Sequence, residues 1–262
     1  NKITEDRTML LAWRAQGIIT FAGYILGFPA DTPATIRRDI AIIKNELPID
    51  LLEFFCLTPL PGSEDHRGLW KSGVAMEADL NIYDTEHPCT AHALMSPAQW
   101  RDIYHEAWAL YYTPEHIKTL LRRAAASAVP LGNLAKYLLT FSTTDRLEGV
   151  HPLQGGILRL KHPSERRRGL PREDAWVFWP RFLWETVRKQ ATLAGMAARL
   201  LVWAVAIARA PGSRAYTDLA LSPVDADGGD ALDLVTKTTG GRTAAAHIRK
   251  VAALTGASDA PR

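Results

Sequence analysis

The sequence predicts an α/β fold in which a short parallel sheet precedes a mainly α-helical extension. Two apolar segments, 18–26 and 50–57, are rich in β-branched and aromatic residues, as is typical of strands buried on both faces of a sheet. Between them, segment 34–47 carries a single apolar stripe with helical spacing. A strand, a helix and a second strand of these lengths form a parallel βαβ unit.

Composition places the chain among ordinary soluble globular proteins. It has 262 residues, 47% of them hydrophobic, which is enough for one large or two small cores. The formal charge of +3 is mild, and the basic run at 166–168 lacks interleaved aromatic residues, so we expect no nucleic-acid partner. Two cysteines disfavour a disulfide scaffold and suit a cytoplasmic location.

The first predicted strand is framed by helices. Apolar residues with helical spacing predict a helix over 3–16, which a glycine closes. Gly27 removes the side chain where the strand stops, and a proline two residues later prevents further ladder hydrogen bonds. Asp31 or Thr32 then caps the helix that Pro33 opens.

The second predicted strand ends in a stiff polar loop, 58–66, which contains two prolines and a glycine. Parallel strands place their carboxyl ends at one edge of the sheet, where ligands bind in α/β folds. The loop therefore either borders a ligand pocket or is a simple rim loop. Two strands do not form a stable parallel sheet alone, so we expect a missing amino-terminal part or a partner chain to complete it.

Segment 78–92 gathers polar and titratable groups in an irregular pattern. A zinc site of His87, Cys89 and His92 is one interpretation, because imidazole and thiolate are good zinc ligands. Their spacing is not that of a standard site, and an extended loop over the mouth of the fold would use the same residues for hydrogen bonds. We therefore expect no metal here.

The pattern that follows is helical. Ser96 and Thr113 each precede a proline, which is the cap chemistry of two helix starts. An aromatic stripe after the first start is expected in the core. A third helix is predicted over 131–141, and the short connections favour antiparallel hairpins. We assign 67–146 to this loop and helical extension.

The last part of the chain divides into a linker or long loop at 147–174, a long amphipathic or apolar helix region at 175–212 and a loosely ordered tail at 213–262. The second half of the helix is apolar except for Arg199, but it is shorter than the roughly 20 residues that a spanning helix needs. We expect a helix buried on its neighbours. The alternative is contact with a membrane surface through 175–210, where Trp and Arg suit the headgroup level.

Residues 23–32, Gly-Tyr-Ile-Leu-Gly-Phe-Pro-Ala-Asp-Thr, resemble the fifth-strand segment of radical S-adenosylmethionine (SAM) enzymes, in which hydrophobic residues precede Gly-Phe/Leu-Pro-Gly-Glu-Thr. Ala30 stands for the usual Gly and Asp31 for the usual Glu. Segment 49–63 is similar to the sixth strand of that family and the Pro-Gly-Thr loop after it. Both segments resemble most the subgroup with an amino-terminal cobalamin (B12)-binding domain.

The resemblance implies the carboxyl-terminal portion of a partial (β/α) TIM-like barrel, with 1–66 as its last strand–helix units. It also implies a [4Fe-4S] cluster and S-adenosyl-L-methionine, which together generate a 5′-deoxyadenosyl radical that takes hydrogen from a small-molecule substrate; with cobalamin, methyl transfer is a common outcome. The cluster needs cysteines spaced Cys-x3-Cys-x2-Cys. This chain has only Cys56 and Cys89, so we interpret it as the carboxyl-terminal part of a longer enzyme and expect this part alone to be inactive.

The same resemblance assigns the adenosine side of the cofactor site to the two strand ends. Candidate substrate contacts come from the polar loop after them. No residue is assigned as a general acid or base. The cofactor candidates are Gly23, Tyr24, Ile25, Gly27, Leu57, Thr58 and Pro59, and the substrate candidates are Tyr83, Asp84, Glu86, His87 and His92.

Two other functions are compatible with this pattern. A non-catalytic scaffold or interaction module derived from such a barrel would keep the strands without the chemistry. An unrelated (β/α) enzyme such as an aldolase needs a Schiff-base lysine or metal-binding carboxylates at the strand ends, and neither strand ends in one. An in-frame upstream Cys-x3-Cys-x2-Cys motif would favour the radical enzyme over the scaffold.

Overall fold

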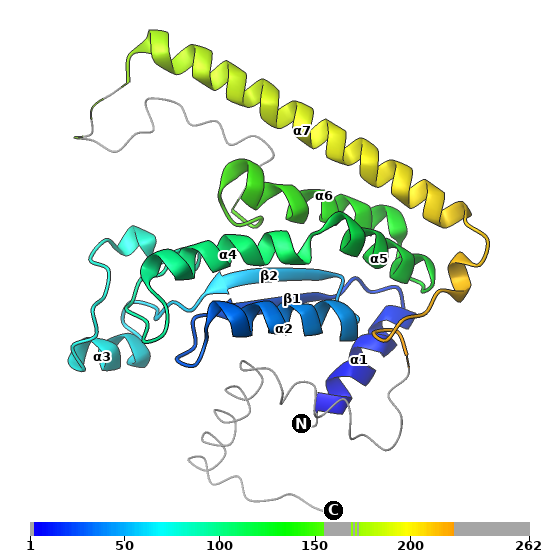
Figure 1. Cartoon of the computed structure of the whole chain (residues 1–262), viewed down its shortest axis with the longest axis horizontal. Helices are drawn as coiled ribbons and strands as arrows, with labels where there is room; N and C mark the ends of the chain where they lie inside the picture. The colour runs from blue at the N-terminus through cyan, green and yellow to red at the C-terminus, as the bar shows by residue number, and fades with distance from the viewer. Residues whose placement is uncertain (1–2, 155–168, 170, 172, 223–262) are drawn as a thin grey trace, which may run out of the picture.

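The computed structural model describes residues 3–154, 169, 171 and 173–222, and it has a mostly helical α/β fold with a two-stranded parallel sheet (Figure 1). The sheet consists of β1 (Phe21–Leu26) and β2 (Leu51–Cys56), which α2 (Pro33–Glu46) connects. The register pairs the first residue of β1 with the first of β2 and the last with the last, so the carboxyl ends of both strands lie together. The predicted βαβ unit is confirmed.

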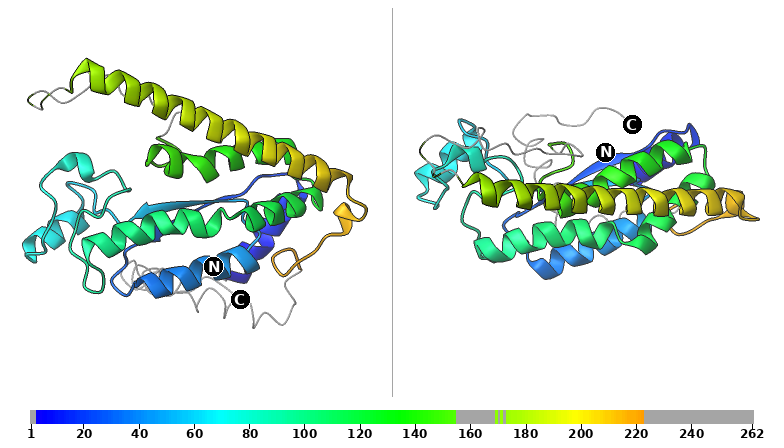
Figure 2. Two further views of the ribbon diagram at one scale, coloured as in Figure 1. Left: turned by 45° about the horizontal axis from the view of Figure 1, so that its top comes forward. Right: turned by 90° about the horizontal axis from the view of Figure 1, so that it is seen from above.

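The helices form layers beside the sheet. Figures 1 and 2 show α4 next to the strands, α6 and α5 beyond it, and α7 at the periphery of the molecule. The remaining elements are α1 (Ile3–Ala15), α3 (Glu64–Lys71), the 3₁₀ turn η1 (Leu80–Ile82), α4 (Pro97–Tyr111), α5 (Pro114–Ala125), α6 (Leu131–Glu148), α7 (Ala175–Arg209) and the 3₁₀ turn η3 (Ser213–Ala215).

The two faces of the sheet have different surroundings. Because side chains alternate along a strand and the register pairs residues directly, three residues of each strand share a face. One face, the helix face, packs against α2 and α4, and its Leu26, Phe54 and Cys56 are almost fully buried. The other face, which we call the open face, consists of Phe21, Gly23, Ile25, Leu51, Glu53 and Phe55.

The open face is poorly covered along β1. Phe21 and Ile25 are 48% and 43% exposed, although the ring of Phe21 touches α6 at one edge. On the β2 side, Leu51 is fully buried and the ring of Phe55 stacks on His151 with 4.8 Å between centroids. The expectation that the first strand is buried on both faces is therefore wrong, because the described segments cover this face mainly over β2.

The outer edges of the two strands also differ. The Tyr112 hydroxyl accepts the Leu52 N–H at 3.1 Å and donates to the Leu52 carbonyl at 2.9 Å, and the Cys56 N–H donates to the Thr85 carbonyl at 2.6 Å. The outer edge of β2 is thus occupied. Among the described residues no segment pairs with the outer edge of β1, and an unpaired edge is a template for a further strand.

Three predicted boundaries are corrected. The first strand begins at Phe21 rather than residue 18, because its partner strand starts only after Pro48. The loop predicted over 58–66 ends early, because the Ser63 side chain accepts the His66 N–H at 3.1 Å and caps α3. The third helix of the extension continues past residue 141 to the left-handed Gly149.

Other local predictions are confirmed. Thr32 caps α2 and Ser96 caps α4, each with a proline in the first turn. Trp100, Tyr104 and Trp108 of the aromatic stripe are buried in the core, at most 4% exposed. Asp31, the alternative cap, instead accepts backbone N–H groups of the loop after β1.

Helix α7 is continuous over 35 residues. We expected it to be buried on its neighbours, but it is buried only along one narrow side. In it, Phe178, Leu200 and Ala204 are buried, and Lys189 donates to the Glu148 carboxylate of α6 at 2.8 Å. Within the described part of the chain it is the one helix long and apolar enough to cross a membrane, judged by length and composition alone. Most of the predicted linker at 147–174 and of the tail at 213–262 lies outside the described residues.

His116 of α5 predicts that stability falls in acid. Burial, together with the positive charges of Lys44 and Arg123, lowers the pKa of its ring to about 3, and its Nε2 has no hydrogen-bond partner among the described residues. In the unfolded chain a histidine has a pKa of about 6.5, so the unfolded state binds the proton first as the pH falls. Stability is therefore full above about pH 6.5 and decreases by up to about 1.4 kcal/mol per pH unit below it.

Denaturant unfolding at a series of pH values tests this expectation. His116→Phe should reduce the slope between about pH 6 and pH 4 but not remove it, because burial also lowers the pKa of His151 to about 4. His66→Gln replaces a half-exposed histidine and is the matched control for the loss of a histidine as such. An unchanged slope in His116→Phe would show that His116 is protonated equally in both states.

Candidate functional site

Two loops meet at the carboxyl ends of the strands. The Leu57 N–H donates to the Leu26 carbonyl at 2.7 Å, which continues the sheet by one bond into both loops. Gly27 starts the first loop with φ of +106°, and a Cβ atom at this position would lie 1.9 Å from the buried Trp100 ring. Only glycine can adopt this backbone conformation and leave room for the Trp100 ring. The prediction that the strand ends at a residue without a side chain is confirmed.

Asp31 holds the first loop in shape. One oxygen of its carboxylate accepts the N–H groups of Gly27 and Phe28, both at 2.9 Å. The side chain is 1% exposed, and its other oxygen has no partner among the described residues. Burial raises the pKa of Asp31, while the two N–H donors lower it. The aspartate thus closes the bend, and Thr32 alone caps the helix.

The three cofactor candidates on β1 and Gly27 just after it have different surroundings. Gly23 and Ile25 lie on the open face, whereas Tyr24 lies on the helix face and donates to Asp39 of α2 at 3.1 Å. Burial, followed by the negative charge of Asp39, raises the pKa of Tyr24. Gly27 is covered by Trp100. Only Gly23 and Ile25 are therefore available to a ligand on the open face.

The cofactor candidates after β2 form a tight turn. Leu57 packs partly against the core and uses its N–H for the sheet bond. Thr58 Oγ1 donates to the Cys56 carbonyl at 3.0 Å, and Pro59 is buried. This turn lies next to the first loop at the same end of the sheet, which is the juxtaposition that the sequence predicts.

His92 is fixed against the first loop. Its Nδ1 accepts the N–H groups of Leu94 and Met95 at 3.0 and 3.1 Å. Nε2 therefore carries the proton and donates to the Phe28 carbonyl at 2.9 Å. The ring also packs edge-on against Trp100, with 5.3 Å between centroids. Both nitrogens are occupied, so His92 supports the loop rather than offering a free imidazole.

The other substrate candidates do not converge with His92. Glu86 is 6% exposed and accepts the His151 N–H at 2.8 Å. Asp84 accepts the backbone N–H groups of Glu86 and His87 and contacts the exposed His87 ring at 2.9 Å. Tyr83 donates to the Glu77 carbonyl at 2.9 Å. The contacts of Asp84 and Tyr83 order the loop from within, and Glu86 joins it to the segment after α6.

Both cysteines are buried free thiols, Cys56 at the end of β2 and Cys89 within this loop. Burial raises the pKa of both Cys56 and Cys89, and the Cys56 thiol donates to the Glu86 carbonyl at 3.4 Å. Neutral thiols of this kind are poor metal ligands. In the described part of the chain no group of three or more His, Cys, Asp or Glu side chains is placed to hold a metal ion.

Sequence reasoning missed Glu53. This residue is the single charged position of β2 and lies on the open face, paired in register with Gly23. Burial raises the pKa of its carboxyl group. The signal was present in the sequence, because a glutamate inside Leu-Leu-Glu-Phe-Phe-Cys contradicts the apolar pattern of the strand. Glu53 therefore places a carboxyl group at the centre of the open face, opposite Gly23, over which the Phe55 ring lies.

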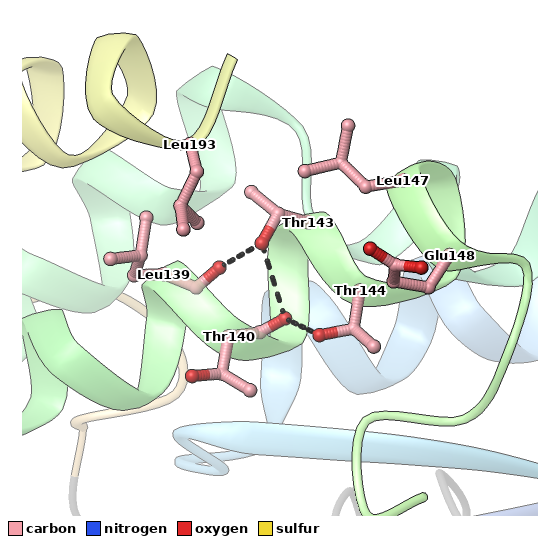
Figure 3. A pocket seen from close by; sticks show the side chains of 7 residues that line it. All are labelled: Leu139, Thr140, Thr143, Thr144, Leu147, Glu148 and Leu193. Carbon is pink, nitrogen blue, oxygen red and sulfur yellow. Dashed lines mark hydrogen bonds between the residues drawn. The ribbon is translucent and has the colours of Figure 1, made fainter. Parts of the chain in front are cut away.

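A separate cavity between α6 and α7 is too small to be a substrate site. It has a volume of about 20 Å³, room for about one water molecule. Figure 3 shows its Thr143 and Thr144 hydroxyls bonded back to the carbonyls of Leu139 and Thr140, at 2.6 and 2.8 Å. The cavity wall therefore offers few free polar groups.

Comparison of the chain with protein-family models, with curated proteins and with solved structures found no match.

Proposed function

We propose that this chain forms the last two strand–helix units of a partial (β/α) TIM-like barrel in a cytoplasmic radical SAM enzyme. The observation that carries the proposal is the asymmetry of the sheet. The outer edge of β2 is occupied by Tyr112 and Thr85, whereas no segment in the described part of the chain pairs with the outer edge of β1, and the open face of β1 is partly exposed. A terminal pair of barrel strands needs this arrangement, because the remaining strands add to one edge and enclose one face.

The open face suits the adenosine part of SAM. At Gly23 the ring of Phe55 lies 3.1 Å from where a Cβ atom would be. This ring and Ile25 therefore form an apolar wall on the open face, against which a flat ring can stack. The turn at Leu57–Pro59 borders the same end. When bound with a reduced cluster, SAM supplies the 5′-deoxyadenosyl radical; the residues of this chain orient the cofactor and exclude water.

The iron–sulfur cluster does not fit on this chain. Its two cysteines, Cys56 and Cys89, are buried and protonated, and a cluster needs three thiolates. We therefore place the cluster, and the cobalamin of the subgroup, on another part of the parent enzyme. Small-molecule substrate would enter between that part and the open face.

Glu53 would provide a polar contact for a ligand on the open face. Its carboxylate points from the centre of the open face, where it would accept hydrogen bonds from ribose or amine groups of a bound ligand. The raised pKa of Glu53 follows from partial burial without a partner in the described residues, and such groups gather at functional sites.

The complete reading frame that contains this chain provides the test. Expressed and purified without oxygen, the protein is expected to contain iron and sulfide in the ratio of a [4Fe-4S] cluster, to bind SAM and to release 5′-deoxyadenosine. Gly23→Leu should keep the iron content but weaken SAM binding by about tenfold or more, because the new side chain displaces the Phe55 ring and disrupts the wall against which adenosine would stack. Glu53→Gln should weaken binding less, since it keeps the shape and loses the charge.

Gly68→Leu is the matched control, because a Cβ at this exposed position of α3 meets nothing within 4 Å. It should keep both iron and SAM affinity. A complete protein without iron would contradict the enzymatic proposal and favour the scaffold, in which a partner chain pairs with the free edge of β1. Equal SAM affinity in Gly23→Leu and wild type would place the cofactor elsewhere.

A further inference from the structure

The outward side of α7 is apolar from Trp176 to Val205. At 3.6 residues per turn, positions separated by seven or eleven residues line up, and Trp176, Leu183, Trp184, Leu201 and Val202 fall on neighbouring lines. They are 91%, 59%, 69%, 65% and 63% exposed. The views in Figures 1 and 2 place α7 at the edge of the molecule with no described segment beyond it. An exposed apolar strip of this length marks an interaction surface.

The inward side of α7 rules out a helix surrounded by lipid. Leu200 belongs to the main core, Lys189 is paired with Glu148 of α6, and Lys118 of α5 lies over the Trp203 ring at 4.8 Å. One side of α7 is thus held on the domain along α5 and α6. A helix with one side on a polar domain and the opposite side apolar lies along a membrane surface rather than across it.

A row of arginines identifies the partner. Arg181, Arg188 and Arg199 recur at seven and eleven residues and therefore share one border of the apolar strip. Arg181 contacts Glu173 and Glu185, whereas Arg188 and Arg199 have no acidic partner in the described part of the chain. A second copy of α7 would bring a like-charged row to this border. Anionic lipid headgroups offer the complementary charge.

We propose that α7 docks the protein on an anionic bilayer surface, with its axis in the membrane plane and its apolar strip among the acyl chains. The tryptophans at its amino-terminal half, Trp176 and Trp184, sit at the headgroup level, where indole rings are favoured. Arg188 and Arg199 bind lipid phosphates. This inference does not depend on the chemistry of the strand ends.

Flotation of the full 262-residue chain with vesicles tests the proposal. The protein is expected to float with phosphatidylcholine vesicles that contain phosphatidylglycerol, and to float far less with phosphatidylcholine alone or in high salt. Trp184→Glu should reduce binding to the anionic vesicles by about tenfold or more, since it removes buried apolar area and adds a charge. Arg188→Glu should reduce it roughly tenfold.

Two matched controls keep the result specific to α7. Trp70→Glu changes a tryptophan on α3 that is 71% exposed, close to the 69% of Trp184, and Arg101→Glu reverses an exposed arginine on α4. Both should float like the wild type. Circular dichroism of each variant checks that the helices are retained.

Three results would overturn the proposal. The first is no flotation of the wild type with either vesicle. The second is an equal loss in Trp70→Glu and Trp184→Glu, which would assign binding to the whole surface. The third is a dimer in solution that Trp184→Glu dissociates while vesicle binding is absent, which would make the strip an interface between copies.

Discussion

Replacing Asp50 with Asn is expected to lower the free energy of unfolding by about 3 to 5 kcal/mol, because it leaves Arg14 as a buried charge without its partner. The two side chains are 0% and 2% exposed and form an ion pair. The second carboxylate oxygen of Asp50 accepts the Thr20 N–H at 3.0 Å. This network joins α1 to the start of both strands, so its loss should also loosen α1. Denaturant unfolding followed by circular dichroism measures the change.

The double variant Arg14→Met with Asp50→Asn separates charge from packing. Removing both charges should recover part of the stability lost in Asp50→Asn, because the penalty comes from the unpaired charge. Glu106→Gln breaks the exposed pair with Arg37, in which the side chains are 37% and 49% exposed, and its effect should be much smaller. A double variant no more stable than Asp50→Asn would mean that packing, not charge, dominates.

Gly27→Ala is expected to lower the free energy of unfolding by roughly 2 to 6 kcal/mol. A non-glycine residue at this positive φ costs about 1 to 3 kcal/mol, and forcing a methyl group against a fixed ring costs about 1 to 3 more. The ring is that of Trp100, which is 1% exposed and cannot move into solvent. Near-ultraviolet circular dichroism should show the disturbed tryptophan.

Gly62→Ala isolates the clash from the backbone strain. Gly62 has φ of +88°, but a Cβ there meets nothing within 4 Å, so only the strain of about 1 to 3 kcal/mol applies. The difference between the two variants is the contribution of the Trp100 contact. Equal destabilisation would show that the loop moves to accommodate the methyl group.

Local signals predicted most of the secondary structure. The Ser-Pro and Thr-Pro pairs located the starts of α4 and α5, and the isoleucine stripe located α2, because caps and periodic burial depend on neighbours within one or two turns. The start of α3 was missed although Ser63 followed by Glu64 and Asp65 is a cap signal. The prolines around it favoured a loop interpretation.

The candidate site was predicted less completely. The sequence placed Gly27 and Leu57 at adjoining strand ends, and the register agrees. The sequence did not predict that Tyr24 would donate a hydrogen bond to Asp39 or that both ring nitrogens of His92 would bond to backbone groups. It also did not predict that Glu86 would accept the His151 N–H. Each of these contacts joins residues that are distant in the chain, apart from the bonds from Leu94 and Met95 to His92.

The sequence by itself determined the βαβ unit, the two bends and the helical extension, since alternation, helical spacing and proline–glycine chemistry act over a few residues. Only the tertiary structure decided which face of the sheet is covered, which edge is free and which side of α7 looks outward. The physical reason is that burial depends on what other segments bring to a surface. An apolar strand or helix has the same composition whether the domain covers it or leaves it for a partner.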